Sequence, residues 1–199
     1  MLRWTRRLLL AFAVSLLGYC GFVLGDAWIF QRRESRNLER RLQEERAASV
    51  GARPAASPAL PPKPPAAVTD GLIGRIEIAR LDLSAVVVEG VGKTALRRAV
   101  GHIPGTALPG QPGNVGIAGH RDTFFRPLRN IRQDDIITLT TVRGEYRYRV
   151  VSTRVVSPDN VAVLDPTGDE ILTLVTCHPF YFVGSAPNRF IVRAERVAG

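Results

Sequence analysis

The sequence predicts an all-β domain, a sandwich or a barrel, over residues 71–199, preceded by a transmembrane helix and a proline-rich linker. Three observations lead to this prediction. An uncharged apolar run lies near the N-terminus, a segment dense in proline and alanine follows it, and short β-branched runs bounded by turn-forming residues fill the remainder. The 199 residues are 45% hydrophobic, which is enough for one folded domain with a core.

The N-terminal run predicts one membrane anchor within residues 1–31. Residues 8–25 carry no charge, and a helix of that length can cross a hydrocarbon layer of about 30 Å. Trp4 and Trp28 flank the run, where interfacial aromatic residues are common. A cleaved signal peptide is the main alternative, but the run is longer than a usual signal core, and no small-x-small site follows it. "LGYC" at residues 17–20 is only weakly similar to a lipoprotein processing site.

Charge alone leaves the orientation of the anchor open. Basic residues lie on both sides of it, at positions 3, 6 and 7 before the run and at 32, 33, 36, 40 and 41 after it. The net charge of +9 is spread along the chain, with no basic run interleaved with aromatic residues. We therefore expect a mildly basic, solvated surface and no nucleic-acid partner.

Residues 32–70 are predicted to form a stalk and a linker. Residues 32–48 are rich in helix formers and in interleaved charges, with Leu38 and Leu42 one turn apart, which predicts a solvated helical stalk. The prolines of residues 51–68 favour an extended spacer.

The folded domain is predicted to contain at least seven strands, and the sequence shows no glycine-rich phosphate-binding motif. A short helix is expected over residues 93–100, and a helical turn near residues 124–131. The predicted strands are residues 73–79, 85–90, 114–120, 136–141, 145–156, 171–177 and 189–197.

Cys177 is the candidate nucleophile. The other cysteine, Cys20, lies in the predicted anchor, so Cys177 has no disulfide partner within the folded domain. It is either a small buried core residue or a reactive thiol. A reactive thiol needs a proton-transfer partner and a donor to the developing oxyanion.

Two of the three histidines are poor candidates for that partner. His178 follows Cys177 directly and would point to the opposite face of the strand, so we interpret it as a turn residue before Pro179. His102 lies among turn formers and is expected to form loop hydrogen bonds.

His120 and Arg189 are the better candidates. His120 ends "NVGIAGH", where Gly116 and Ala118 on the same face would leave space for a ligand's backbone. Arg189 begins an alternating strand, and a guanidinium can donate two hydrogen bonds at once to a carbonyl or an oxyanion. Taken alone, a strand arginine is more often a solvated edge residue.

These residues resemble the sortases, a family of membrane-anchored cysteine transpeptidases. The resemblance lies in "TLVTC" at residues 173–177, "GHRDTFF" at 119–125 and "NRFIV" at 188–192, and it covers about residues 71–197, most like the class D branch. It implies an eight-stranded sortase-type β-barrel with one or two short helices.

The resemblance also implies roles for individual residues. Cys177 would be the nucleophile, His120 its acid/base partner and Arg189 the stabiliser of oxyanion and substrate. Thr176, which precedes the cysteine as in the family, would help to shape the substrate site. Ala118 is predicted to bind substrate because of the space expected beside it.

The implied reaction is cleavage of an LPxTG-like sorting signal on a secreted protein and transfer to an amine acceptor, either peptidoglycan or a pilin lysine. The implied topology is single-pass, with the N-terminus in the cytoplasm and the catalytic domain outside. We expect no cofactor and no metal, because the only acidic pair noted is Asp134 with Asp135, and no C-x-x-C spacing exists for zinc.

Two alternatives belong to other functional classes. A hydrolytic cysteine protease would use the same residues with water as the acceptor, and product analysis with an added amine distinguishes it. A non-catalytic, membrane-tethered binding domain would hold Cys177 buried and inert, and thiol labelling of the folded protein distinguishes that.

Overall fold

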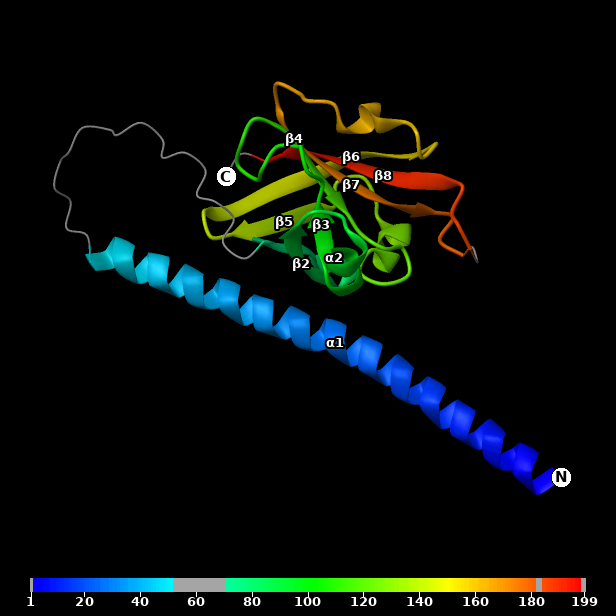
Figure 1. The fold of residues 1–199 in the computed structure, drawn as a ribbon. Helices are drawn as coiled ribbons and strands as arrows, with labels where there is room; N and C mark the ends of the chain where they lie inside the picture. Colours follow the sequence, from blue (N-terminus) through cyan, green and yellow to red (C-terminus); the bar gives the residue numbers. More distant parts are fainter. Residues whose placement is uncertain (1, 52–70, 182–183, 198–199) are drawn as a thin grey trace, which may run out of the picture.

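The structure is a computed structural model that describes residues 2–51, 71–181 and 184–197. A long helix, α1 (Leu2–Gly51), lies beside a closed β-barrel (Figure 1). α1 contains a segment long and apolar enough to cross a membrane. The predicted linker, residues 51–68, falls almost entirely outside the described residues.

Eight strands close the barrel in the order β1-β2-β3-β4-β7-β8-β6-β5. Most neighbours are antiparallel, whereas β2 with β3 and β4 with β7 are parallel. The strands are β1 (Leu72–Ile78), β2 (Leu83–Glu89), β3 (Val100–His102), β4 (Gly113–Ala118), β5 (Ile136–Thr141), β6 (Gly144–Val156), β7 (Glu170–His178) and β8 (Asn188–Arg196).

The apolar side chains that alternate along each strand fill the barrel interior. In β5, Ile137 and Leu139 are fully buried, and the residues between them are partly exposed. Leu172 and Leu174 of β7 and Val192 of β8 join the same core cluster. Cys177 lies on the outer face of β7, where the strand ends and its side chain is partly exposed.

The predicted eight-stranded barrel is confirmed, and one strand was missed. β3 has only three residues, and the helix predicted over residues 93–100 ends at Arg98 as α2 (Lys93–Arg98), so that Val100 begins β3 instead. Short 3-10 helices complete the barrel: η2 (Ala79–Leu81), η3 (Arg126–Asn130), which lies within the predicted turn, and η4 (Val161–Leu164).

The predicted stalk is helical and largely exposed, but one face of it is not solvated. Leu38 of α1 is 1% exposed and packs with Leu72 of β1 and Val86 of β2, while Leu42 covers the edge of this cluster. The two leucines one turn apart form an apolar stripe, and that stripe binds the barrel of the same chain.

Polar contacts extend this docking toward the N-terminus of α1. Asp26 accepts hydrogen bonds from Nε and Nη2 of Arg98 at 2.7 and 3.0 Å. Gln31 donates to the Arg98 carbonyl at 2.6 Å and accepts from the Val86 amide at 2.8 Å. The barrel is therefore held against α1 from Asp26 to Leu42.

Candidate active site

Cys177 and Arg189 lie directly opposite each other on β7 and β8. Opposed residues on paired strands point to the same face, with Cβ atoms about 5 Å apart. The neighbouring residues Leu174 and Val192 point into the core, so Cys177 and Arg189 share the outer face. The pairing of the thiol with the guanidinium therefore follows from the strand register.

His120 lies just beyond the end of β4, beside β7. Ala118 of β4 pairs with Val175 of β7, and both strands run in the same direction from there. The carbonyl of His120 accepts hydrogen bonds from the amides of Thr123 and Phe125. Because Phe125 is fully buried in the core, this turn fixes His120 at the barrel end.

The three predicted residues line one pocket of about 330 Å³. His120 is exposed, and Cys177 and Arg189 are partly exposed. Among the described residues, neither the Cys177 thiol nor the His120 imidazole has a hydrogen-bond partner. A substrate entering the pocket therefore meets both groups. The lining comprises His120, Arg121, Asp122, Cys177, Gly184, Ser185, Ala186 and Arg189.

Arg189 is held in place by its own loop and keeps donors free. Its Nη1 donates to the carbonyls of Asn188 and Ala186 at 3.0 and 3.2 Å. Within the described parts of the chain, it has no carboxylate partner, and Nε and Nη2 have no acceptor. β8 pairs with strands on both sides, so Arg189 is not on a sheet edge.

Thr176 faces inward and is only 2% exposed. Its hydroxyl donates to the Gly119 carbonyl at 2.7 Å, which ties the strand that carries Cys177 to the loop that carries His120. The structure therefore places Thr176 under the site, where it can fix the relative position of the thiol and the imidazole.

Ala118 lies on the same outer face as Cys177, but it does not line the pocket. The space expected above Gly116 is filled: a Cβ there would lie 3.0 Å from the Thr106 methyl and 3.1 Å from Leu164. The expectation of an open surface along β4 was wrong at Gly116, because the loop before β4 and η4 cover that part of the strand.

Arg121 is a site residue that the sequence analysis missed. It is 6% exposed, and its guanidinium donates to the carbonyls of Pro179 at 2.7 Å and Gly184 at 3.2 Å. It therefore connects the loop of His120 to the loop between β7 and β8. The only signal available was its place next to His120 in "GHRDTFF".

The other histidines lie apart from the pocket. The His178 ring packs on Phe180 and Phe190, on the face opposite Cys177 as predicted. His102 is 3% exposed at the end of β3, where Nδ1 is 2.9 Å from Glu89 and Nε2 is 2.9 Å from the Ala107 carbonyl. His102 forms hydrogen bonds as expected, but it lies on a buried strand and not in a loop.

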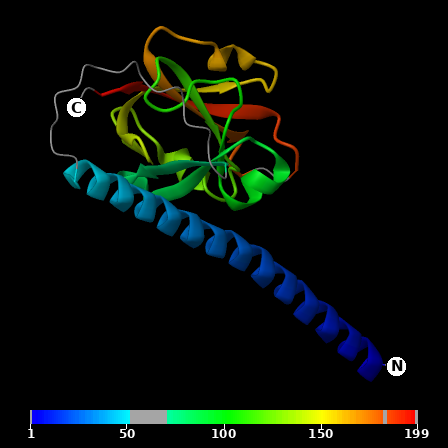
Figure 2. The ribbon, with the colours of Figure 1, turned by 60° about the vertical axis from the view of Figure 1, so that its left-hand side comes forward.

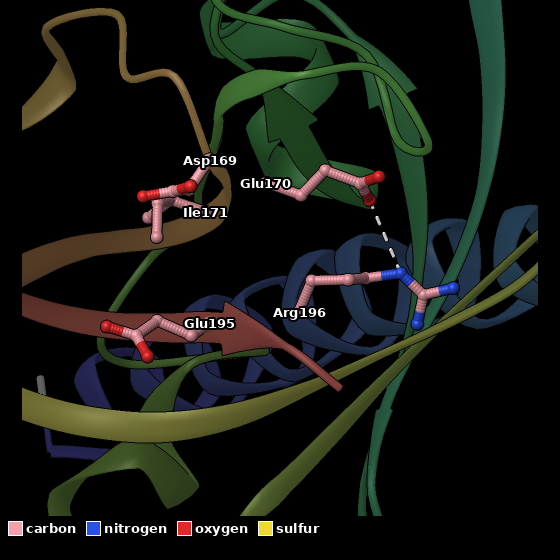
Figure 3. Close-up of a pocket in the computed structure, with 5 residues that line it drawn as sticks. All are labelled: Asp169, Glu170, Ile171, Glu195 and Arg196. Atoms are coloured by element: carbon pink, nitrogen blue, oxygen red, sulfur yellow. Dashed lines mark ion pairs between the residues drawn. The ribbon is translucent and has the colours of Figure 1, made fainter. Parts of the chain in front are cut away.

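A second pocket, of about 410 Å³, lies where β7 begins and β8 ends, far along both strands from Cys177 (Figure 3). Glu170 and Arg196 form an ion pair there at 3.3 Å. No nucleophile lines this pocket. Within the described residues, no group of three or more His, Cys, Asp or Glu side chains could hold a metal.

A thiol, an imidazole and a guanidinium around one pocket form a site of the cysteine-nucleophile class. Comparison with known proteins identifies the family. The sortase-domain profile matches residues 76–197, more than half of the chain, and the chain therefore belongs to the sortase family.

Relatives agree with this assignment. Sortase D of Bacillus subtilis is 34% identical over 125 residues, which cover 62% of this chain and 63% of that protein. The chain thus spans less than two thirds of the length of that relative.

Solved structures share the fold. A Clostridium perfringens Sortase D5 transpeptidase superimposes with a TM-score of 0.65 at 24% identity, covering 85% of this chain and 99% of that one. Sortase C2 of Pilus Island 1 from Group B Streptococcus gives a TM-score of 0.61 at 27% identity, covering 65% and 76%.

Proposed function

We propose that this protein is a membrane-anchored cysteine transpeptidase that cleaves an LPxTG-like sorting signal and transfers the cleaved protein to an amine. The observation that carries the proposal is the convergence of Cys177, His120 and Arg189 on one pocket. The thiol supplies a nucleophile, the imidazole a proton-transfer group and the guanidinium a fixed double donor.

In the first step, the Cys177 thiolate attacks the carbonyl carbon of the Thr–Gly bond. Arg189 donates from its free Nε and Nη2 to the oxygen on which negative charge develops. The C–N bond breaks, and protonated His120 gives its proton to the departing amine. The products are a thioester on Cys177 and the released C-terminal fragment.

In the second step, the acceptor amine attacks the thioester. His120, now neutral, takes the proton from that amine, an amide bond forms and the C–S bond breaks. Cys177 leaves as the thiolate, which restores the starting state. We propose a peptidoglycan amine or a pilin lysine as the acceptor. Thr176 acts as a positioning residue, and Ala118 borders the path of the substrate.

The division of the chain follows the same proposal. Residues 1–31 form the cytoplasmic terminus and the anchor, residues 32–70 the stalk and linker, and residues 71–199 the catalytic domain outside the cytoplasm. The uncharged run of α1 supports the anchor. The cytoplasmic N-terminus is the topology that the resemblance to the sortases implies, because charge alone leaves the orientation open.

Product analysis tests the reaction. The full chain in detergent is incubated with an LPxTG peptide, with and without an added amine, and the products are identified by mass spectrometry. We expect a peptide–amine conjugate, and none with Cys177→Ala, which replaces one small strand residue by another. Hydrolysed peptide alone in the presence of amine would favour a protease, and unchanged peptide would favour the binding-domain alternative.

A further inference from the structure

The docking of α1 fixes which end of the barrel faces the N-terminal half of that helix. Asp26 holds Arg98 of α2, Gln31 holds Val86 of β2, and Leu38 packs behind them. These contacts are spread over several turns of one continuous helix. The barrel therefore has a defined direction relative to the apolar run.

The active-site end of the barrel is the end directed toward the N-terminus of α1. In Figures 1 and 2, the end of β7 and the start of β8 lie on the side to which the N-terminal half of α1 extends. The turn between β5 and β6 lies on the opposite side, near the C-terminal end of α1.

The apolar run of α1 places the membrane surface at this end of the barrel. Residues 8–25 are uncharged, and Asp26 is the first charged residue after them. Because Asp26 is also the residue that binds α2, the barrel begins where the hydrocarbon layer would end. The pocket at Cys177 then lies at the end of the barrel that is nearer the headgroup layer.

The side chains at this end match an anionic headgroup layer. Lys93 and Arg97 on α2 and Arg126 and Arg129 on η3 are exposed, and Arg97 also lies 3.9 Å from Asp26. Tyr181, just after β7, is 78% exposed, and its ring centroid lies 5.6 Å from the Arg129 guanidinium carbon. Basic residues bind lipid phosphates, and tyrosine is favoured at membrane interfaces.

We propose that the active-site end of the barrel rests on the headgroups of the membrane that α1 enters. Lys93, Arg97, Arg126, Arg129 and Tyr181 form this membrane-facing surface, and anionic phospholipid is its partner. The inference rests on the membrane anchor of the proposed function. It implies that a peptide emerging from the bilayer reaches Cys177 without movement of the domain.

Headgroup quenching tests the proposal on the full chain. The protein, with Cys177→Ala and Cys20→Ser, is reconstituted in phosphatidylglycerol vesicles. An environment-sensitive fluorophore is placed at Thr123→Cys, in the loop of His120, or at Arg143→Cys, in the β5–β6 turn. We expect headgroup nitroxide lipids to cause a large loss of emission at position 123 and little loss at position 143.

A label on the native Cys20, in the Cys177→Ala protein, tests the membrane anchor separately from the membrane-facing surface. A fluorophore on Cys20 should be quenched by nitroxide on the acyl chains if α1 spans the bilayer. If Cys20 is quenched but positions 123 and 143 lose emission equally, the membrane-facing surface is contradicted and the anchor is not. Failure to quench Cys20 would overturn the anchor and, with it, this inference.

Charge reversal tests the surface itself. Arg126→Glu with Arg129→Glu should reduce the quenching at position 123. High salt should also reduce it in the protein without these two changes, because salt screens surface electrostatics. The matched control is Arg147→Glu with Arg154→Glu, on exposed positions of β6, which should leave it unchanged. Equal quenching in both double variants would contradict the assignment of these arginines.

Discussion

The proposed role of Arg189 depends on the planar geometry of its guanidinium, which presents two donors in fixed directions. Its Nη1 donates to the Asn188 and Ala186 carbonyls, which leaves Nε and Nη2 as the donors available to a substrate. A lysine would keep the charge but not the two directed donors.

Arg189→Lys is therefore expected to slow acylation of Cys177 by a factor on the order of 10² to 10³, the usual cost of one lost oxyanion donor. Thermal stability should change little. Single-turnover kinetics measures the acylation rate, and thermal melting measures the stability. Arg193→Lys, on the same face of β8, is the matched control and should acylate normally. Near-normal acylation by Arg189→Lys would leave the oxyanion to other donors.

Arg121 should act through position, because it donates to two carbonyls of the β7–β8 loop as well as to Asp122. Arg121→Lys cannot reach both, and each hydrogen bond to a charged group contributes about 1.5–3 kcal/mol. We expect slower acylation together with faster amide exchange in residues 180, 181 and 184–186. The exposed Arg126→Lys serves as the control. If activity is lost while amide exchange stays unchanged, the result would instead indicate that Arg121 contacts the substrate.

The sequence predicted the three side chains that line the pocket, but it did not predict the hydrogen bonds that hold the surrounding loops in place. Chemical type left structural alternatives open for Cys177 and Arg189, and the resemblance to the sortases selected them together with His120. Arg121 binds backbone carbonyls of a loop that is distant in sequence, and a carbonyl carries no residue-type signal. The same holds for Thr176, whose partner is the Gly119 carbonyl.

At the scale of elements, the turn after β4 depends on a close contact between Gly119 and Phe125. A Cβ at Gly119 would lie 2.7 Å from a ring carbon of Phe125, which is closer than packed carbon atoms allow.

Gly119→Ala should therefore displace the Phe125 ring and, with it, the turn that carries His120. Overpacking of this kind costs about 1–3 kcal/mol, and we expect a larger loss of activity than of stability. Denaturant unfolding and peptide cleavage measure the two effects. Gly168→Ala, which meets open space, is the control. Full activity in Gly119→Ala would show that the position of His120 does not depend on this contact.

The ion pair between Arg80 and Asp135 joins η2 to the segment before β5. Arg80 Nη2 donates to Asp135 at 2.6 Å and to the Asn130 carbonyl at 2.7 Å. The hydrogen bond from Arg80 lowers the pKa of Asp135 below its ordinary value, against the opposing effect of burial, and the Arg132 amide adds to the lowering.

Because the folded pKa of Asp135 is depressed, its stabilisation is present above the ordinary carboxyl pKa of about 3.9 and disappears as the pH falls through the folded value. Asp135→Asn should lower the free energy of unfolding by about 2 kcal/mol at neutral pH, and the difference should shrink in acid. Denaturant unfolding at both pH values measures this, with Asp159→Asn as the exposed control. A difference that does not depend on pH would contradict the ion-pair account.

Elements with a strong local sequence pattern could be predicted, whereas elements that depend on pairing with a neighbouring strand could not. β5 has the predicted bounds because apolar and polar residues alternate along it. β3 offers only one large apolar residue in three, so its pairing with β2 and β4 defines it. The docking of Leu38 on Val86 could not be predicted, since two leucines fit a barrel or a second helix equally well.

At the scale of the whole molecule, α1 joins the N-terminal apolar run to the barrel. The same helix contains the apolar run and the residues that bind α2 and β2. The N-terminal helix and the β-barrel were predictable from the change from apolar to β-branched segments. The direction of the pocket was not, because it depends on contacts between segments that are far apart in the chain.

The central claim is that Cys177 forms a thioester with the cleaved sorting signal. The most direct measurement is intact-mass and peptide-mapping mass spectrometry of the full chain, mixed with an LPxTG peptide without an acceptor and stopped in acid. We predict an adduct of the N-terminal peptide fragment on Cys177, which disappears when an amine is added and never forms in Cys177→Ala. Peptide cleavage without any adduct on Cys177, or an adduct on another residue, would contradict this account.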